Sequence, residues 1–102
     1  MTPAIHNPER KKRTPLTLDV EINFGQGAHR ALTADMSESG VAIISDKAIY
    51  HEVGSCCRMK GEHKDKPFHI DCHVVRVYAN KMALAFHNSL ENQIALRAIL
   101  DR

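Results

Sequence analysis

The sequence predicts an all-β fold, mainly antiparallel, in which a small six-stranded barrel is followed by a C-terminal α-helix. Residues 16–24 alternate strictly between apolar and polar side chains, the pattern of a strand that is buried on one face. Shorter alternating segments follow, separated by turn-forming residues. After residue 88 the apolar period changes to about 3.6, as in a helix. A chain of 102 residues accommodates this architecture as one domain.

The first half of the chain contains three of the predicted strands. The first ends at the turn Gly25-Gln26-Gly27, and the third runs from Gly40 to Ile44 with apolar residues on both faces, which indicates fuller burial. The apolar residues of the first strand are Leu16, Leu18, Val20, Ile22 and Phe24. In the second strand we expect the buried face to carry Leu32, Ala34 and Met36, opposite Ala31, Thr33 and Asp35.

The other three strands follow a connection over residues 45–54. In the fourth, Cys57 and Met59 alternate with polar neighbours, and the polar segment 61–66 is expected to be a hairpin loop. The fifth carries an apolar face, and at Val74-Val75 its phase slips so that Val75 and Val77 continue on the other face, which predicts a β-bulge. The apolar face of the fifth strand comprises Phe68, Ile70, Cys72 and Val74, and that of the sixth Met82, Leu84 and Phe86.

The last segment predicts a helix over 89–101 that covers one end or face of the strands. Asn88 and Glu91 have the spacing of a capping box. We therefore expect the barrel domain, with this helix, to cover residues 15–102. The predicted apolar stripe consists of Leu90, Ile94 and Ala98, flanked by Ala95, Ile99 and Leu100.

Residues 1–14 are predicted to be a flexible basic arm. Residues 1–13 hold four Lys/Arg and one Glu, so within a formal net charge of +2 the remaining residues carry −1. A nucleic-acid binder usually spreads cations along a face and stacks bases on aromatic side chains. Because the charge is concentrated in the arm and only 5% of the residues are aromatic, we expect a small anionic ligand rather than nucleic acid.

Membrane insertion, a metal centre and catalysis have little support. The longest aliphatic run is Val41–Ile44 and the N-terminus lacks the apolar core of a secretion signal, so we expect a cytoplasmic protein. His69, Asp71 and His73 share one strand face, and we interpret them as solvent-facing residues, with no metal and no cofactor. No nucleophile stands at a catalytic spacing from a histidine and an orienting acid, so the chain is not expected to be an enzyme.

The segment Asp35-Met36-Ser37-Glu38-Ser39-Gly40 joins two predicted strands. Its Asp and Ser can bond local backbone N–H groups in a turn, or the carboxylate, hydroxyl and glycine can be presented to a ligand. Together with the basic arm, the segment resembles the PilZ domain, the cyclic di-GMP receptor module whose signature is R-x-x-x-R followed by [D/N]-x-S-x-x-G. The resemblance implies that Asp35, Ser37 and Gly40 bind the ligand, with Asp35 accepting from guanine N–H groups.

The arm follows the first half of that signature with one departure. Arg13-Thr14-Pro15-Leu16 fits the second arginine and the entry into the first strand, whereas Glu9 occupies the place of the first arginine. Arg10 and Lys11 are the nearby cations that can replace it, Lys11 only as a point charge. Arg76 lies where many family members place a planar side chain against a guanine, and an arginine can stack there.

The resemblance implies a bacterial cyclic di-GMP receptor. The ligand phosphates would draw Arg10 and Arg13 against the barrel, and ordering of the arm would signal to a downstream protein partner that the sequence does not identify. The alternative is a degenerate PilZ-like domain that does not bind cyclic di-GMP and acts as a protein–protein interaction adaptor, which Glu9 favours.

Overall fold

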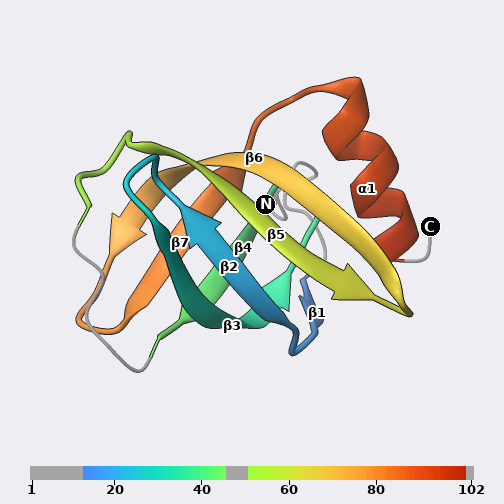
Figure 1. The fold of residues 1–102 in the computed structure, drawn as a ribbon, viewed down its shortest axis with the longest axis horizontal. Helices are drawn as coiled ribbons and strands as arrows, with labels where there is room; N and C mark the ends of the chain where they lie inside the picture. The colour runs from blue at the N-terminus through green and yellow to red at the C-terminus, as the bar shows by residue number, and fades with distance from the viewer. Residues whose placement is uncertain (1–12, 46–50, 101–102) are drawn as a thin grey trace, which may run out of the picture.

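The computed structural model describes residues 13–45 and 51–100, which form a closed antiparallel barrel and one helix (Figure 1). Six strands, β2 to β7, make the barrel, and the two-residue β1 pairs alongside β3. The predicted fold class is confirmed. The elements are β1 (Thr14–Pro15), β2 (Asp19–Asn23), β3 (Ala28–Met36), β4 (Gly40–Ile44), β5 (Cys56–His63), β6 (Lys66–Val77), β7 (Lys81–Phe86) and α1 (Leu90–Leu100).

The barrel closes because β3 pairs on both sides. The neighbours run β3-β2-β5-β6-β7-β4, and β4 then pairs back onto β3, so the sheet has no free edge along this circuit. In Figure 1 α1 lies at one end of the barrel, beside β6, with which it makes its main contacts. No helix in the described ranges is long and apolar enough to cross a membrane.

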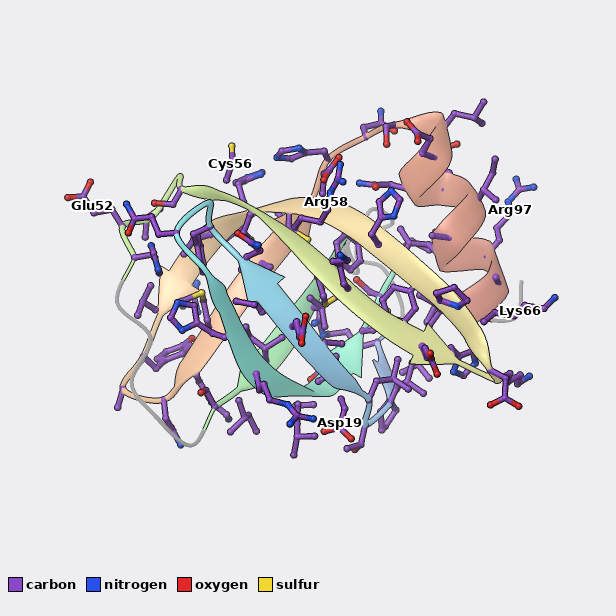
Figure 2. All side chains as sticks on the ribbon, in the orientation of Figure 1. Asp19, Glu52, Cys56, Arg58, Lys66 and Arg97 are labelled. Carbon is purple, nitrogen blue, oxygen red and sulfur yellow. The ribbon has the colours of Figure 1, made fainter. Side chains whose placement is uncertain are left out.

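The barrel interior is filled by the alternating residues that the sequence marks as apolar. In β2, β5, β6 and β7 the predicted inward residues are buried or half-buried. Charged side chains such as Asp19, Arg58 and Lys66 project outward from the ribbon (Figure 2). The buried apolar core comprises Val20, Ile22, Ala31, Met36, Val41, Ile43, Cys57, Met59, Ile70, Cys72, Val74, Met82, Leu84, Leu96 and Ile99.

The predicted buried face of the second strand is wrong over its first part. Ala31 and Thr33 are buried, whereas Leu32 is 44% exposed. The Thr33 hydroxyl accepts a hydrogen bond from the Leu18 N–H at 2.8 Å and donates to the Leu16 carbonyl. These bonds tie the segment between β1 and β2 to β3, so within the predicted first strand, residues 16–24, only Asp19–Asn23 is a strand. A buried hydroxyl that satisfies two backbone groups outweighs the burial of one leucine.

The loop predicted over 61–66 is shorter in the structure. β5 continues to His63 and β6 begins at Lys66, so only Lys64 and Asp65 form the turn. Both have positive φ, 54° and 66°, the conformation of a two-residue type I′ hairpin. The segment is polar because the ends of both strands are exposed. A search for alternating apolar residues does not detect such strand ends.

The bulge predicted at Val74-Val75 is present, with a different consequence for the two valines. The register between β6 and β7 shifts between Val74 and Arg76. Val75 is 46% exposed, whereas Val77 packs against the core. The extra residue therefore leaves Val75 outside the barrel and turns Val77 inward, so the two valines do not share the outer face.

Helix α1 lies in the predicted segment but is rotated relative to the predicted stripe. Leu90 and Ile94 are 71% and 61% exposed, and the buried residues are Asn92, Leu96 and Ile99. The cap is Ser89, whose Oγ accepts from the Asn92 N–H at 3.1 Å, one residue after the expected Asn88. Residue 101, at the end of the predicted helix, lies outside the described residues.

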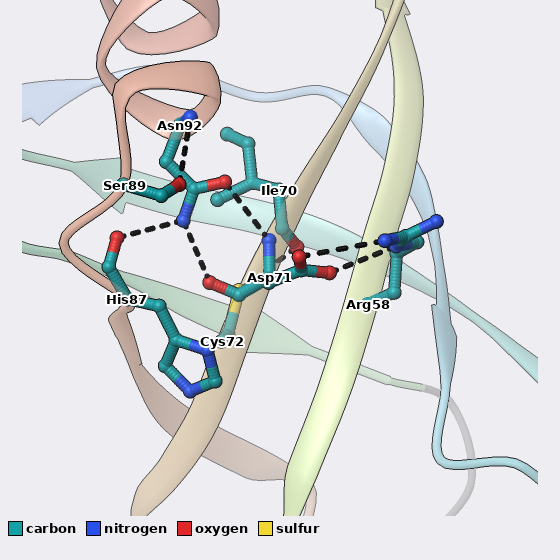
Figure 3. A network of polar contacts seen from close by, with 7 residues as sticks. All are labelled: Arg58, Ile70, Asp71, Cys72, His87, Ser89 and Asn92. Atoms are coloured by element: carbon teal, nitrogen blue, oxygen red, sulfur yellow. Dashed lines mark hydrogen bonds and ion pairs between the residues drawn. The ribbon is translucent and has the colours of Figure 1, made fainter.

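Asn92 causes this rotation because it links the helix to β6 and to the end of β7 (Figure 3). Its Oδ1 accepts from the Asp71 N–H at 3.2 Å. Its Nδ2 donates to the carbonyls of Asp71 at 2.9 Å and His87 at 2.8 Å. Asn92 is only 2% exposed, so these bonds satisfy its amide group inside the protein.

Replacing Asn92 by alanine is expected to destabilise the fold by about 2 kcal/mol, since three part-buried hydrogen bonds are lost and the Asp71 N–H is left without its partner. Thermal unfolding followed by circular dichroism measures the effect. Gln93→Ala is the matched control, because the Gln93 side chain is bonded to exposed Asn88 instead. Equal melting temperatures for the two variants would show that Asn92 does not anchor the helix.

Candidate functional site

Arg13 and Asp35, 22 positions apart in the chain, are joined by an ion pair at the barrel surface. Arg13 Nε donates to Asp35 Oδ1 at 2.6 Å, and a guanidinium Nη2 contacts the same oxygen. The side chains are 48% and 37% exposed. β1 holds the arginine in place, because Pro15 pairs with Asp35 and Thr14 with Met36. The sequence predicted both residues as ligand contacts, and the structure places them together.

Two β-bulges determine which face the candidate residues occupy. In β3 the register against β4 shifts between Thr33 and Asp35, with Ala34 as the extra residue. In β6 the equivalent shift against β7 falls between Val74 and Arg76. Because side chains alternate along a strand, regular pairing would put Asp35 on the side of buried Thr33 and Arg76 on the side of buried Val74. Both bulges turn a charged residue outward.

Asp35 and Arg76 lie at the two ends of one row across the barrel. The register pairs Asp35 with Ala42, Ala42 with Ala83, and Ala83 with Arg76. Directly paired residues point to the same face. The row crosses three strand spacings, or roughly 14 Å. The result is an outer strip with a carboxylate at one end, a guanidinium at the other and two half-exposed alanines between them.

Arg76 is held by a residue that the sequence did not single out. Its guanidinium lies 6.0 Å from the centre of the Tyr78 ring, and Nη1 donates to the Tyr78 hydroxyl at 2.9 Å. Tyr78 is 49% exposed. Tyr78 could have been found from its position two residues after Arg76, since residues two apart on a strand share a face. The pair supplies a planar cation and an aromatic surface at this end of the strip.

Ser37 is buried within the turn between β3 and β4. It is 0% exposed. Its Oγ accepts from the Ser39 N–H and lies 3.2 Å from the Ser39 hydroxyl, and its own N–H donates to the Gly40 carbonyl at 2.9 Å. The hydroxyl therefore organises the turn that follows Asp35, as Ser commonly does in local turns.

Gly40 is needed for the close approach of β4 to β7. A Cβ at this position would lie 2.5 Å from the Leu84 carbonyl oxygen. No positive φ is involved, so the glycine provides space and not an unusual backbone conformation. The close contact is with the neighbouring strand of the barrel.

The other predicted site residues lie beyond the part of the chain that the structure describes. Arg10 and Lys11 fall in residues 1–12, as does most of the predicted arm. The end of that arm, Arg13 and Thr14, is described and joins the barrel through the ion pair with Asp35 and through β1.

Asp71 and His73, two of the three residues that the sequence places on one strand face, have partners within the protein. Arg58 binds the Asp71 carboxylate at 2.8 Å and holds the pKa of that carboxyl below its usual range. The rings of His73 and His87 stack at 5.3 Å. The described residues contain no group of three His, Cys, Asp or Glu side chains able to hold a metal. Cys56 is exposed and Cys57 buried, on opposite faces as strand alternation predicts.

A pocket of about 480 Å³ opens beside the Asp35–Gly40 turn. Glu38 and Ser39 line it on the side of the turn, and α1 lines the other side. Phe86, at the end of β7, also lines it and donates its N–H to the Ser39 carbonyl at 2.9 Å, so the pocket lies where the turn meets β7.

Comparison with known proteins agrees with this fold. The family model of the PilZ domain matches residues 8–102. Similar solved structures include the inhibitor of motility MotI/DgrA of Bacillus subtilis, with a TM-score of 0.74 and 20% identity over 94% of this chain and 51% of that one. The PilZ domain of CeSA from a cellulose-synthesizing bacterium has a TM-score of 0.77 and 15% identity over 88% and 96% of the two chains.

A third structure, an uncharacterized Legionella protein, has a TM-score of 0.61 and 15% identity over 89% of this chain and 91% of that one. No curated protein matches the sequence. The chain spans about half the length of the motility inhibitor. At these identities the solved structures establish the fold, and the family assignment comes from the family model.

Proposed function

The chain belongs to the PilZ domain family, and from this membership we propose that it is a cyclic di-GMP receptor whose ligand lies on the strip between Asp35 and Arg76. The observation that carries the proposal is the pair of β-bulges that turn these two residues to the outer face. Bulges are common beside functional sites, where they re-aim a side chain. Proteins of this family are ligand-binding receptors, and we propose no catalytic activity.

The Arg13–Asp35 pair is suited to one guanine and its phosphate. Both arginine contacts fall on Asp35 Oδ1, and the described residues make no hydrogen bond to Oδ2. Oδ2 can therefore accept from a guanine N–H while the ion pair persists. The remaining Arg13 Nη1 can donate to a phosphate oxygen or to the guanine O6/N7 edge.

The other residues of the proposed site have distinct tasks. Ala42 and Ala83 give the base a flat surface, and Arg76, supported by Tyr78, can lie against it. Ser37 and Gly40 contribute by holding the turn that presents Asp35. Arg10 and Lys11 supply further positive charge for the phosphates, and ordering of the arm on binding changes the surface offered to a downstream protein.

Isothermal titration with cyclic di-GMP, using cyclic di-AMP and GTP as controls, tests the proposal. Saturable binding of the guanine dinucleotide alone is the expected result. A folded protein that binds none of the three would refute it.

Glu9 favours a second candidate function, a PilZ-like adaptor that acts through protein contacts without cyclic di-GMP. A glutamate cannot donate to a phosphate and would repel one. Under this alternative, wild type does not bind cyclic di-GMP, whereas Glu9→Arg restores the R-x-x-x-R spacing with Arg13 and creates binding. Binding of cyclic di-GMP by wild type with the same affinity as Glu9→Arg would exclude this alternative.

Asp35→Ala is expected to weaken cyclic di-GMP binding about tenfold, because a charge-assisted acceptor for the guanine N–H groups is removed. The melting temperature should change little, since an exposed ion pair contributes little stability. Asp19→Ala, which removes an exposed carboxylate on β2, is the control. Unfolding of Asp35→Ala would assign Asp35 to the turn and not to the ligand.

A further inference from the structure

We infer that the pocket between the Asp35–Gly40 turn and α1 receives the second guanine of the dinucleotide and selects it against adenine. This inference rests on the proposed function. The outer strip has one carboxylate, Asp35, so it offers the acceptor pair that a guanine N1–H and N2–H edge needs only once. A second guanine requires another acceptor and its own donors.

The pocket carries both types of group on opposite sides. Glu38 lines it from the turn and Arg97 lines it from α1. A guanine edge presents N–H donors at N1 and N2 beside acceptors at O6 and N7. A carboxylate on one side and a guanidinium on the other therefore match guanine in one orientation. Adenine has a lone pair at N1, which would face the carboxylate, and a donor at N6 in place of O6, so only its N7 acceptor still matches the guanidinium.

The shape of the pocket suits a planar base. Its volume of about 480 Å³ lies in the range of small-molecule sites. Phe86, Leu96 and Leu100 supply apolar surface for the faces of the ring. Leu96 also belongs to the barrel core, so this side of the pocket is rigid.

The pocket and the outer strip are within reach of one ligand. Glu38 is three residues after Asp35, a separation of at most about 11 Å along the chain. The turn between them is fixed by the Ser37 N–H bond to the Gly40 carbonyl at 2.9 Å. One dinucleotide can therefore contact Asp35 with one base and enter the pocket with the other, which predicts one ligand per chain.

Titration of the full chain with cyclic di-GMP and with the mixed dinucleotide cyclic GMP–AMP of the bacterial linkage tests the inference. Wild type should bind cyclic di-GMP at least about tenfold more tightly than the mixed ligand, which has one guanine only. Glu38→Gln and Arg97→Gln should weaken cyclic di-GMP and leave cyclic GMP–AMP within about twofold, so that the preference disappears. Glu62→Gln and Lys60→Gln, exposed charges of β5 outside this pocket, are the matched controls.

The outcomes separate the two proposals. If wild type binds cyclic di-GMP and both pocket variants keep the full preference, the second guanine lies elsewhere and the inference is wrong, while the proposed function stands. If folded wild type does not bind cyclic di-GMP, the proposed function fails and the inference fails with it. Arg97 is exposed on α1 (Figure 2), and melting temperatures close to that of wild type would exclude misfolding as the cause of a lost preference.

Discussion

Arg13→Ala is expected to weaken cyclic di-GMP binding roughly 10–100-fold, which corresponds to a charge-assisted, bidentate contact of about 1.5–3 kcal/mol. Arg13 is the one signature arginine within the described residues, and β1 and Asp35 hold it at the end of the strip. Its removal also leaves the Asp35 carboxylate without its cation near the ligand phosphates, which adds repulsion.

Two further variants define what Arg13 contributes. Arg13→Lys keeps the charge but not the planar fork, so it should recover only part of the affinity. Arg30→Ala removes an exposed arginine from β3, the strand that carries Asp35, and this variant should bind nearly as tightly as wild type. Isothermal titration measures all three. If Arg13→Ala and Arg30→Ala lose affinity equally, the arginine acts only through net charge, and the proposed contact does not exist.

The barrel was predictable because its inward residues are apolar and alternate. Where a polar side chain fills an interior position, the prediction was wrong. In β3, Thr33 occupies the interior and bonds two backbone groups, and the bulge at Ala34 then reverses the phase. A count of apolar residues therefore assigned Leu32 to the core. The same bulge puts Asp35 on the outer face, so the irregular position is also the candidate functional one.

The helix was misassigned for a similar reason. Its apolar residues outnumber the places available on its inner face, and hydropathy alone selects Leu90 and Ile94. The structure buries Asn92 instead, because its amide accepts from the Asp71 N–H and donates to the carbonyls of Asp71 and His87. Which polar residue meets exposed backbone atoms depends on the positions of β6 and β7, and local sequence does not contain that information.

The site was predicted in part. The motif resemblance identified Asp35 and Arg13, but it could not show that the two form an ion pair, because that pairing depends on β1 aligning with β3. Tyr78 and the α1 side of the pocket lie outside the signature and became apparent only from the register and the position of the helix.

Gly40→Ala is expected to destabilise the fold by about 3 kcal/mol or more, since the new methyl group would meet a backbone oxygen that cannot rotate away. The Cβ would lie 2.5 Å from the Leu84 carbonyl oxygen, in the pairing of β4 with β7. For a domain of this size the melting temperature should fall by roughly 12 °C or more. Ala42→Ser adds one atom to the same strand on its half-exposed outer face and should change stability little.

The comparison of Gly40→Ala with Asp35→Ala divides the motif by mechanism. Loss of binding together with a large fall in melting temperature for Gly40→Ala, and loss of binding at nearly unchanged melting temperature for Asp35→Ala, would assign the glycine to strand packing and the aspartate to the ligand. A Gly40→Ala variant that melts like wild type but fails to bind would reverse the assignment of the glycine. The methyl group would then obstruct the ligand, and β4 and β7 would have moved apart to admit it at little energetic cost.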